Sequence, residues 1–115
     1  MRLYLPTTLS ALAGFVAAGE VSGVEGYLPD ADDEVAEYAA LMQAAADSQD
    51  LLAGPGRRVV VVVELPEAAD PDAPVPLRRV VAVHADPEDR PAGADPDDDL
   101  GWYASQEIDR LLATT

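Results

Sequence analysis

The chain lacks cysteine and lysine and contains only one histidine. Without cysteine it has no disulfides, no thiolate metal sites and no cysteine nucleophile. One histidine without cysteine partners rarely makes a transition-metal site, so we expect no metal and no cofactor. The absence of thiols suits a reducing compartment, and the expected location is the cytoplasm.

Positive charge is scarce throughout the chain. The net charge is −15, and no basic residue occurs between Leu3 and Gly56. Such a field repels the phosphates of nucleic acids and anionic membrane surfaces, so we expect neither as a partner. No apolar stretch approaches the ~20 residues of a spanning helix. We interpret the apolar start as a strand and a helix of the mature domain rather than a secretory signal, because Pro6 interrupts the run.

Aromatic residues make up only 5 % of a chain that is 49 % apolar, so valine, leucine and alanine must fill the core. The length of 115 residues fits one domain, residues 1–115. The predicted strands are RLYL, GVEGYL, RRVVVVVEL and LRRVVAVHA, and the third is too continuous for a sheet that is covered on one face only.

Helical spacing of apolar residues predicts three helices. Thr7 or Thr8 caps the first, whose buried stripe includes Leu12, and Gly19 closes it. Aspartates at 30–33 cap the second, whose predicted buried stripe is Val35, Tyr38, Met42, Ala45, Gln49 and Leu52. The third begins at Leu100 and carries the stripe Leu100, Ala104, Ile108, Leu111 and Leu112.

The order of elements is therefore β-α-β-α-β-β-α. We expect an α/β fold with a mixed four-stranded sheet and three helices, packed as a two- or three-layer sandwich.

Five segments together resemble a known family. They are MRLYLPTTL, DEVAEYAAL, RRVVVVVELP, VPLRRVVAVH and DDDLGWYASQEI, in this order over nearly the whole chain. The chain is similar to a family of small acidic actinobacterial proteins whose domain has no assigned function. The resemblance implies a cytoplasmic bacterial protein and brings no activity, and the connections EAADPDAP and DPEDRPAGADP are shorter than is usual in that family.

His84 and Asp86 form a His-X-Asp pair at the end of a predicted strand. Such a pair is a candidate for two metal ligands, or for a general base and its orienting carboxylate. A strand-end histidine that bonds locally is the alternative that we favour. Asp95, Asp97 and Asp99 imitate a calcium loop, but leucine and glutamine occupy the places of its essential glycine and glutamate. We interpret this segment as the cap of the last helix.

The WYASQE segment holds further candidates. On a helix, Trp102 and Gln106 would point away from the apolar stripe, and Trp102 would either meet a partner or fold under the acidic loop. Tyr103 and Glu107 would lie beside the stripe. Glu107 is a candidate acid or base with a raised pKa, although we favour a bond to Arg78, Arg79 or a backbone amide.

Thr7 and Thr8 follow a strand, at the position where α/β sheets bind ligands near helix N-termini. No glycine-rich phosphate loop accompanies them. Tyr38, in the second helix, is expected to bury its ring and to need one acceptor for its hydroxyl.

Three hypotheses about function remain. The first is a non-enzymatic acidic domain that acts through protein contacts, with an unknown partner or with itself. The second is a small hydrolase or isomerase that uses His84, Asp86 and Glu107. The third is a carboxylate surface that mimics nucleic acid. We favour the first, because the chain has few residues that serve catalysis.

Overall fold

A four-stranded sheet forms the middle layer of the protein. The computed structural model describes residues 1–114, and within them this sheet has the strand order β1-β3-β5-β6. Its strands are β1 (Arg2–Thr7), β3 (Val59–Glu64), β5 (Val80–Ala85) and β6 (Gly101–Ala104). Every neighbouring pair is antiparallel. A separate two-stranded sheet pairs β2 (Glu20–Val21) with β4 (Val75–Pro76).

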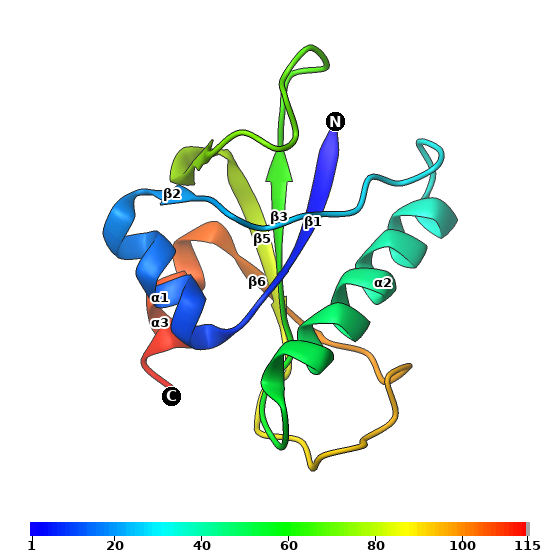
Figure 1. Ribbon diagram of the computed structural model, residues 1–115, viewed down its shortest axis with the longest axis vertical. Coiled ribbons are helices and arrows are strands. Elements are labelled where there is room, and N and C mark those ends of the chain that lie inside the picture. Colours follow the sequence, from blue (N-terminus) through cyan, green and yellow to red (C-terminus); the bar gives the residue numbers. More distant parts are fainter. Residues whose placement is uncertain (115) are drawn as a thin grey trace.

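Helices cover both faces of the main sheet. Within residues 1–114 these are α1 (Leu9–Ala18), α2 (Glu34–Leu52) and α3 (Ile108–Leu112). In Figure 1, α1 and α3 lie on one side of the strands and α2 lies on the other, so the fold has three layers. The predicted α/β class, with a four-stranded sheet and three helices, is confirmed. The sheet was expected to be mixed, whereas its recorded pairs are all antiparallel, because residues 23–28 do not join it as a strand and residues 101–104 do.

The valines of β3 join the two cores. Val59, Val61 and Val63 pack in one core with Leu12 of α1 and Leu111 of α3. The alternate residues Val60 and Val62 pack in the other core with the alanines of α2. Successive side chains of a strand point to opposite faces, so a run of valines fits a strand that is covered on both faces, as predicted.

The helix ends follow the predicted signals. The Thr8 hydroxyl accepts a hydrogen bond from the Ala11 N–H at 3.1 Å, and the Asp33 carboxylate accepts one from the Ala36 N–H at 2.8 Å. Both residues are N-caps, which satisfy amides that have no partner within the helix. Gly19 ends α1 with φ of 77°, a left-handed conformation that glycine adopts without strain.

The buried face of α2 differs from the predicted stripe. Val35 is 82 % exposed and Tyr38 is 51 % exposed, whereas the buried residues are Ala40, Ala44, Ala45 and Ser48. Small side chains let the helix pack closely on β1 and β3. Ala45 of the predicted stripe is buried as expected, but Val35 and Tyr38 are not, because the prediction followed the large apolar residues and gave the other alanines too little weight.

Residues 101–104 form an edge strand, although they were predicted as part of the last helix. Trp102 pairs with His84 and Tyr103 with Val83 across the β5–β6 ladder. A 3-10 turn (Ser105–Glu107) then leads into the short α3, and another (Leu77–Arg79) precedes β5. Aromatic residues favour strands, and this preference prevailed over an apolar spacing that also fits a helix.

The predicted strand at 23–28 reduces to one bridge. Tyr27 exchanges two backbone hydrogen bonds with Tyr4 and thereby covers the outer edge of β1. The chain crosses β1 so closely that a Cβ on Gly26 would lie 2.6 Å from Leu5 Cδ2. Glycine at this position lets the segment pass close to the side chains of Leu3 and Leu5, and this approach, rather than a strand, accounts for the second glycine.

Candidate functional site

A groove opens between the start of α1 and the end of α2, and we call it the α1–α2 groove. Its volume is about 590 Å³. It lies where β1 ends, the position that the sequence predicted for Thr7 and Thr8. Its lining comprises Pro6, Thr7, Thr8, Ala11, Phe15, Ser22, Gly23, Val24, Glu25, Asp47, Asp50 and Leu51.

The inner surface of the α1–α2 groove is largely apolar. Phe15 of α1 and Val24 of the following loop are half-buried and rest on the core beneath. Leu51 of α2 is 58 % exposed, although leucine is a residue type that proteins commonly bury. An open apolar surface of this kind is a typical place for a ligand or a partner to bind.

Three carboxylates line the same groove. Glu25 and Asp50 are exposed, and Asp47 is half-buried and accepts a hydrogen bond from the Tyr27 hydroxyl. This hydrogen bond raises the pKa of Tyr27 above its usual value. Within residues 1–114 none of the three carboxylates pairs with an arginine. The groove therefore carries uncompensated negative charge.

Helix dipoles change this charge little. The C-terminal end of α2 adds about half a negative charge, and the N-terminus of α1 adds about half a positive charge. Thr8 already caps an amide at that N-terminus. The two partial charges largely cancel, and the carboxylates dominate the potential.

Ser48 holds Thr7, a residue of the groove lining, in place. Its hydroxyl donates to the Thr7 carbonyl oxygen at 2.7 Å and accepts from the Val59 N–H at 2.8 Å. One buried side chain thus joins α2, the end of β1 and the start of β3. Thr7 itself is buried, so of the two predicted threonines only Thr8 presents a partly exposed side chain.

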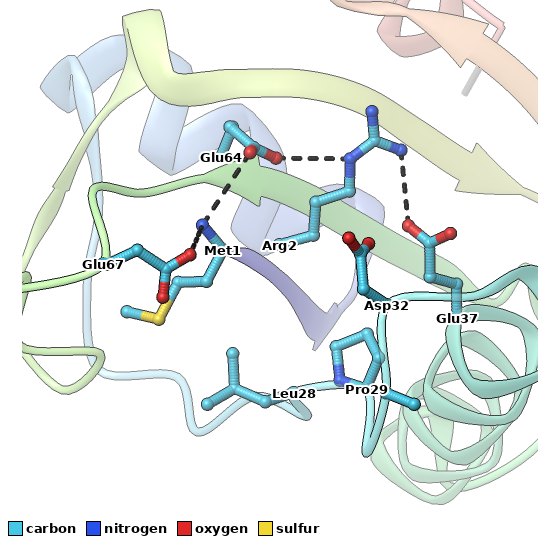
Figure 2. A pocket seen from close by; sticks show the side chains of 9 residues that line it. Met1, Arg2, Leu28, Pro29, Asp32, Glu37, Glu64 and Glu67 are labelled. Carbon is cyan, nitrogen blue, oxygen red and sulfur yellow. Dashed lines mark hydrogen bonds and ion pairs between the residues drawn. The ribbon is translucent and has the colours of Figure 1, made fainter.

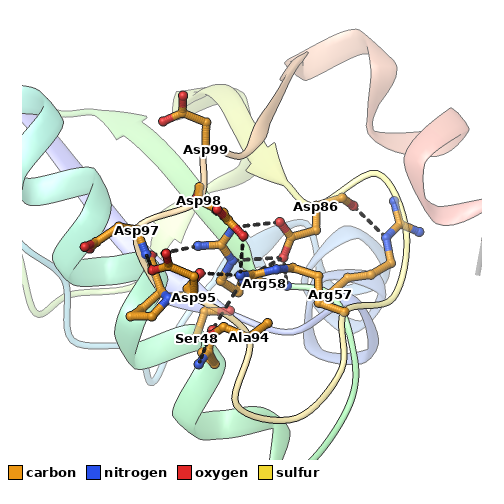
Figure 3. A network of polar contacts seen from close by, with 12 residues as sticks. Ser48, Arg57, Arg58, Asp86, Ala94, Asp95, Asp97, Asp98 and Asp99 are labelled. Carbon is orange, nitrogen blue, oxygen red and sulfur yellow. Dashed lines mark hydrogen bonds and ion pairs between the residues drawn. The ribbon is translucent and has the colours of Figure 1, made fainter.

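Asp86 forms a buried ion pair with Arg58 (Figure 3). The Arg58 Nη2 and Nε atoms donate to the two carboxylate oxygens at 2.8 and 2.9 Å, and the Arg58 backbone N–H donates at 2.8 Å. Arg57 Nε donates to the Asp86 carbonyl oxygen at 2.7 Å. Both charges are buried and bonded, which indicates a structural role.

The same arginine holds the acidic loop at 86–100. Arg58 Nη1 donates to the Pro96 carbonyl oxygen at 3.1 Å, and Nη2 donates to that of Asp98 at 2.9 Å. Arg90 pairs with the Asp98 carboxylate at 3.2 Å, and Tyr38 of α2 donates to Asp99 at 2.9 Å. That bond raises the pKa of Tyr38. The loop is therefore fastened to the sheet and to α2.

His84 lies on the face of the sheet that α2 covers in part. It is opposite Val60 on β3 and Trp102 on β6, and burial lowers its pKa. Trp102 is 62 % exposed. Within the described residues, no hydrogen bond or ion pair joins His84 to Asp86 or to Glu107.

The remaining candidates lie after β6. Glu107 Oε1 accepts from the Ala104 N–H at 3.0 Å, so the carboxylate is engaged by a backbone amide. Tyr103 packs against the core with α1 and α3, and Gln106 is exposed. None of these side chains reaches the α1–α2 groove, whose lining comes from other elements.

A second cavity, of about 490 Å³, lies beside the first strand (Figure 2). Arg2 pairs there with Glu64 at 3.2 Å and Glu37 at 3.8 Å, and the Met1 ammonium is 3.5 Å from Glu67. Its glutamates thus have cationic partners within the protein, although Asp32, which also lines the cavity, has none in the ion pairs of residues 1–114; none of the three carboxylates of the α1–α2 groove has such a partner. This difference makes the groove the better candidate site.

Thr7 and Thr8 marked the position of the groove, but the sequence predicted neither its apolar lining nor the role of Arg58. Phe15, Val24 and Leu51 are far apart in the chain, and no periodic pattern marks them as neighbours. The pairing of Arg58 with Asp86 follows from the register of β3 and β5, in which Val59 is opposite Ala85, and the sequence had predicted only that these two strands pair.

Two further tests concern metals and membranes. Among the described residues, no group of three or more histidine, aspartate or glutamate side chains is arranged to hold a metal ion. None of the helices within residues 1–114 combines the length and the hydropathy of a membrane-spanning helix.

The fold and the groove define an α/β domain with an open site, in which an apolar surface lies beside three carboxylates. A model of a family of unknown function, DUF6912, matches residues 1–112, and the chain belongs to this family. The comparisons with curated proteins and with solved structures gave no match.

Proposed function

We propose that this chain is a non-enzymatic binding domain that recognises a partner protein through the α1–α2 groove. The observation that carries the proposal is the apolar surface between α1 and α2, where Leu51 is 58 % exposed. Apolar anchors that enter such pockets supply most of the binding energy of protein interfaces. We place this function in the cytoplasm, consistent with a chain without cysteine.

The engagement of the candidate catalytic groups favours binding over catalysis. Asp86 is bonded to Arg58, and Glu107 is bonded to the backbone of Ala104. A hydrolase or isomerase that uses His84 with these carboxylates would need them within hydrogen-bond reach of one substrate. Each is instead committed to a different structural contact.

The charge of the chain favours a protein over a nucleic acid or a lipid surface. A net charge of −15 repels both kinds of phosphate-bearing partner. A protein can present apolar and basic side chains together, which matches both properties of the groove.

Capture from a cytoplasmic extract of the source organism tests the proposal. The bait is the wild-type protein, with Leu51→Gln as the groove variant and Val35→Gln as the control. Both substitutions replace an exposed apolar residue of α2, and Val35 lies outside the groove. We expect the wild type and Val35→Gln to retain one protein that Leu51→Gln loses.

Light scattering after size exclusion distinguishes a partner from self-association. A dimer that Leu51→Gln dissociates would show that the groove binds a second copy. An identical set of captured proteins for all three baits would refute a role of the groove.

A further inference from the structure

The carboxylates of the α1–α2 groove point to the chemistry of its partner. We infer that the groove binds a basic segment of another protein, in which arginine or lysine residues flank an apolar side chain. This inference rests on the proposed function and names the kind of partner that the site takes.

Charge and apolar surface come together in one small space. Glu25 lies on the loop after β2, whereas Asp47 and Asp50 lie on α2. Phe15 and Leu51 line the same groove. A ligand that fills the apolar surface must therefore bring its neighbouring groups close to the carboxylates.

The negative charge of the groove has no counter-charge within the described residues. The buried arginines are used elsewhere: Arg58 binds Asp86, and Arg57 donates to the Asp86 carbonyl. Arg90 holds the acidic loop. Carboxylates that line one groove without a counter-charge favour a basic partner over an acidic one.

The long-range field supports the same partner. A net charge of −15 accelerates encounters with basic proteins and slows those with acidic ones. A second copy of the chain is a weaker occupant, because two molecules of this charge repel each other. Its only adjacent pairs of basic residues are Arg57–Arg58, which are buried, and Arg78–Arg79.

Fluorescence anisotropy with a synthetic peptide tests the inference. The probe is a labelled peptide with leucines flanked by arginines, and the comparison peptides replace either the arginines by glutamates or the leucines by serines. The protein variants are Glu25→Gln/Asp50→Asn in the groove and Glu88→Gln/Asp89→Asn as the control. The control pair is exposed and outside the groove, and it changes the net charge equally.

We expect the groove variant to weaken binding about tenfold, because each exposed charge pair contributes modestly. The control variant should change the Kd less than about twofold, since a screened distant charge contributes little. Both comparison peptides should bind more weakly than the probe. Leu51→Gln should also weaken binding of the probe.

Four outcomes would overturn the inference. Equal losses in the two charge variants would show that only net charge attracts the peptide. Tighter binding of the glutamate peptide would show that the groove prefers an acidic ligand. Binding of an apolar amine such as phenethylamine in place of the peptide would show that the groove takes a small amine instead. If the peptide fails while capture from extract still depends on Leu51, the proposed function stands and the basic partner does not.

Discussion

Replacing Asp86 by asparagine tests the buried ion pair that supports the acidic loop. Arg58 is 0 % exposed and Asp86 is 2 % exposed, so water cannot solvate the guanidinium once its partner is neutral. Removing one member of a buried pair costs about 3–5 kcal/mol, because the remaining charge is left uncompensated.

The structure places the expected loss near the lower end of this range. Arg58 keeps its bonds to the carbonyl oxygens of Pro96 and Asp98, and asparagine retains one acceptor oxygen. We therefore expect the free energy of unfolding to fall by about 3 kcal/mol. With a urea dependence of about 1–3 kcal/mol per molar, the midpoint should fall by about 1–3 M.

Urea unfolding followed by far-ultraviolet circular dichroism measures this loss. Asp89→Asn is the control, because Asp89 is an exposed aspartate of the same loop. Its free energy of unfolding should stay within about 0.5 kcal/mol of the wild-type value. A loss below about 1 kcal/mol for Asp86→Asn would refute the argument that the pair is energetically coupled. The double variant Arg58→Met/Asp86→Leu should be more stable than Asp86→Asn, since it buries no unpaired charge.

Two further predictions concern His84 and Ser48. Burial lowers the pKa of His84, so the unfolded chain binds the proton more readily than the folded protein. The free energy of unfolding should therefore fall as the pH drops through about 6.5. In urea unfolding, His84→Gln should reduce this loss between about pH 7.5 and 5.5. An unchanged pH dependence in His84→Gln would contradict this. Ser48→Ala should cost about 1–3 kcal/mol in thermal or urea unfolding, because the Val59 N–H and the Thr7 carbonyl lose their shared partner. A variant as stable as wild type would show that water replaces the hydroxyl.

Local signals predicted much of the fold. Thr8 and Asp33 cap the N-termini of their helices and Gly19 caps the C-terminus of α1, as expected, because capping depends on a few neighbouring backbone groups. The valine run of β3 indicated a strand covered on both faces, which requires helices on two sides. These features depend on short segments that the sequence displays directly.

Tertiary contacts decided the elements that were predicted wrongly. Residues 101–104 pair with β5, from which a long acidic loop separates them in the sequence, and no local pattern predicts that pairing. The face of α2 is set by how closely Ala40 and Ala44 approach the sheet. Large apolar residues such as Val35 mark the wrong side when small residues make the contact.

The candidate site was only partly predictable. The rule that ligands bind beyond strand ends led to Thr7 and Thr8, which line the groove. Phe15 and Leu51 could not be grouped from sequence, because their proximity depends on the packing of α1 and α2 around the sheet.

The hold of Arg58 on the acidic loop has a consequence for variation of the chain. Arg58 donates hydrogen bonds to the backbone carbonyl oxygens of Pro96 and Asp98, and every residue type has such an oxygen. The part of the anchorage that Arg58 supplies is thus independent of the side chains at these two positions, whereas the contacts of Arg90 with Asp98 and of Tyr38 with Asp99 need the carboxylates. Substitutions at the other exposed positions of the loop can therefore change the surface charge while Arg58 keeps the backbone in place.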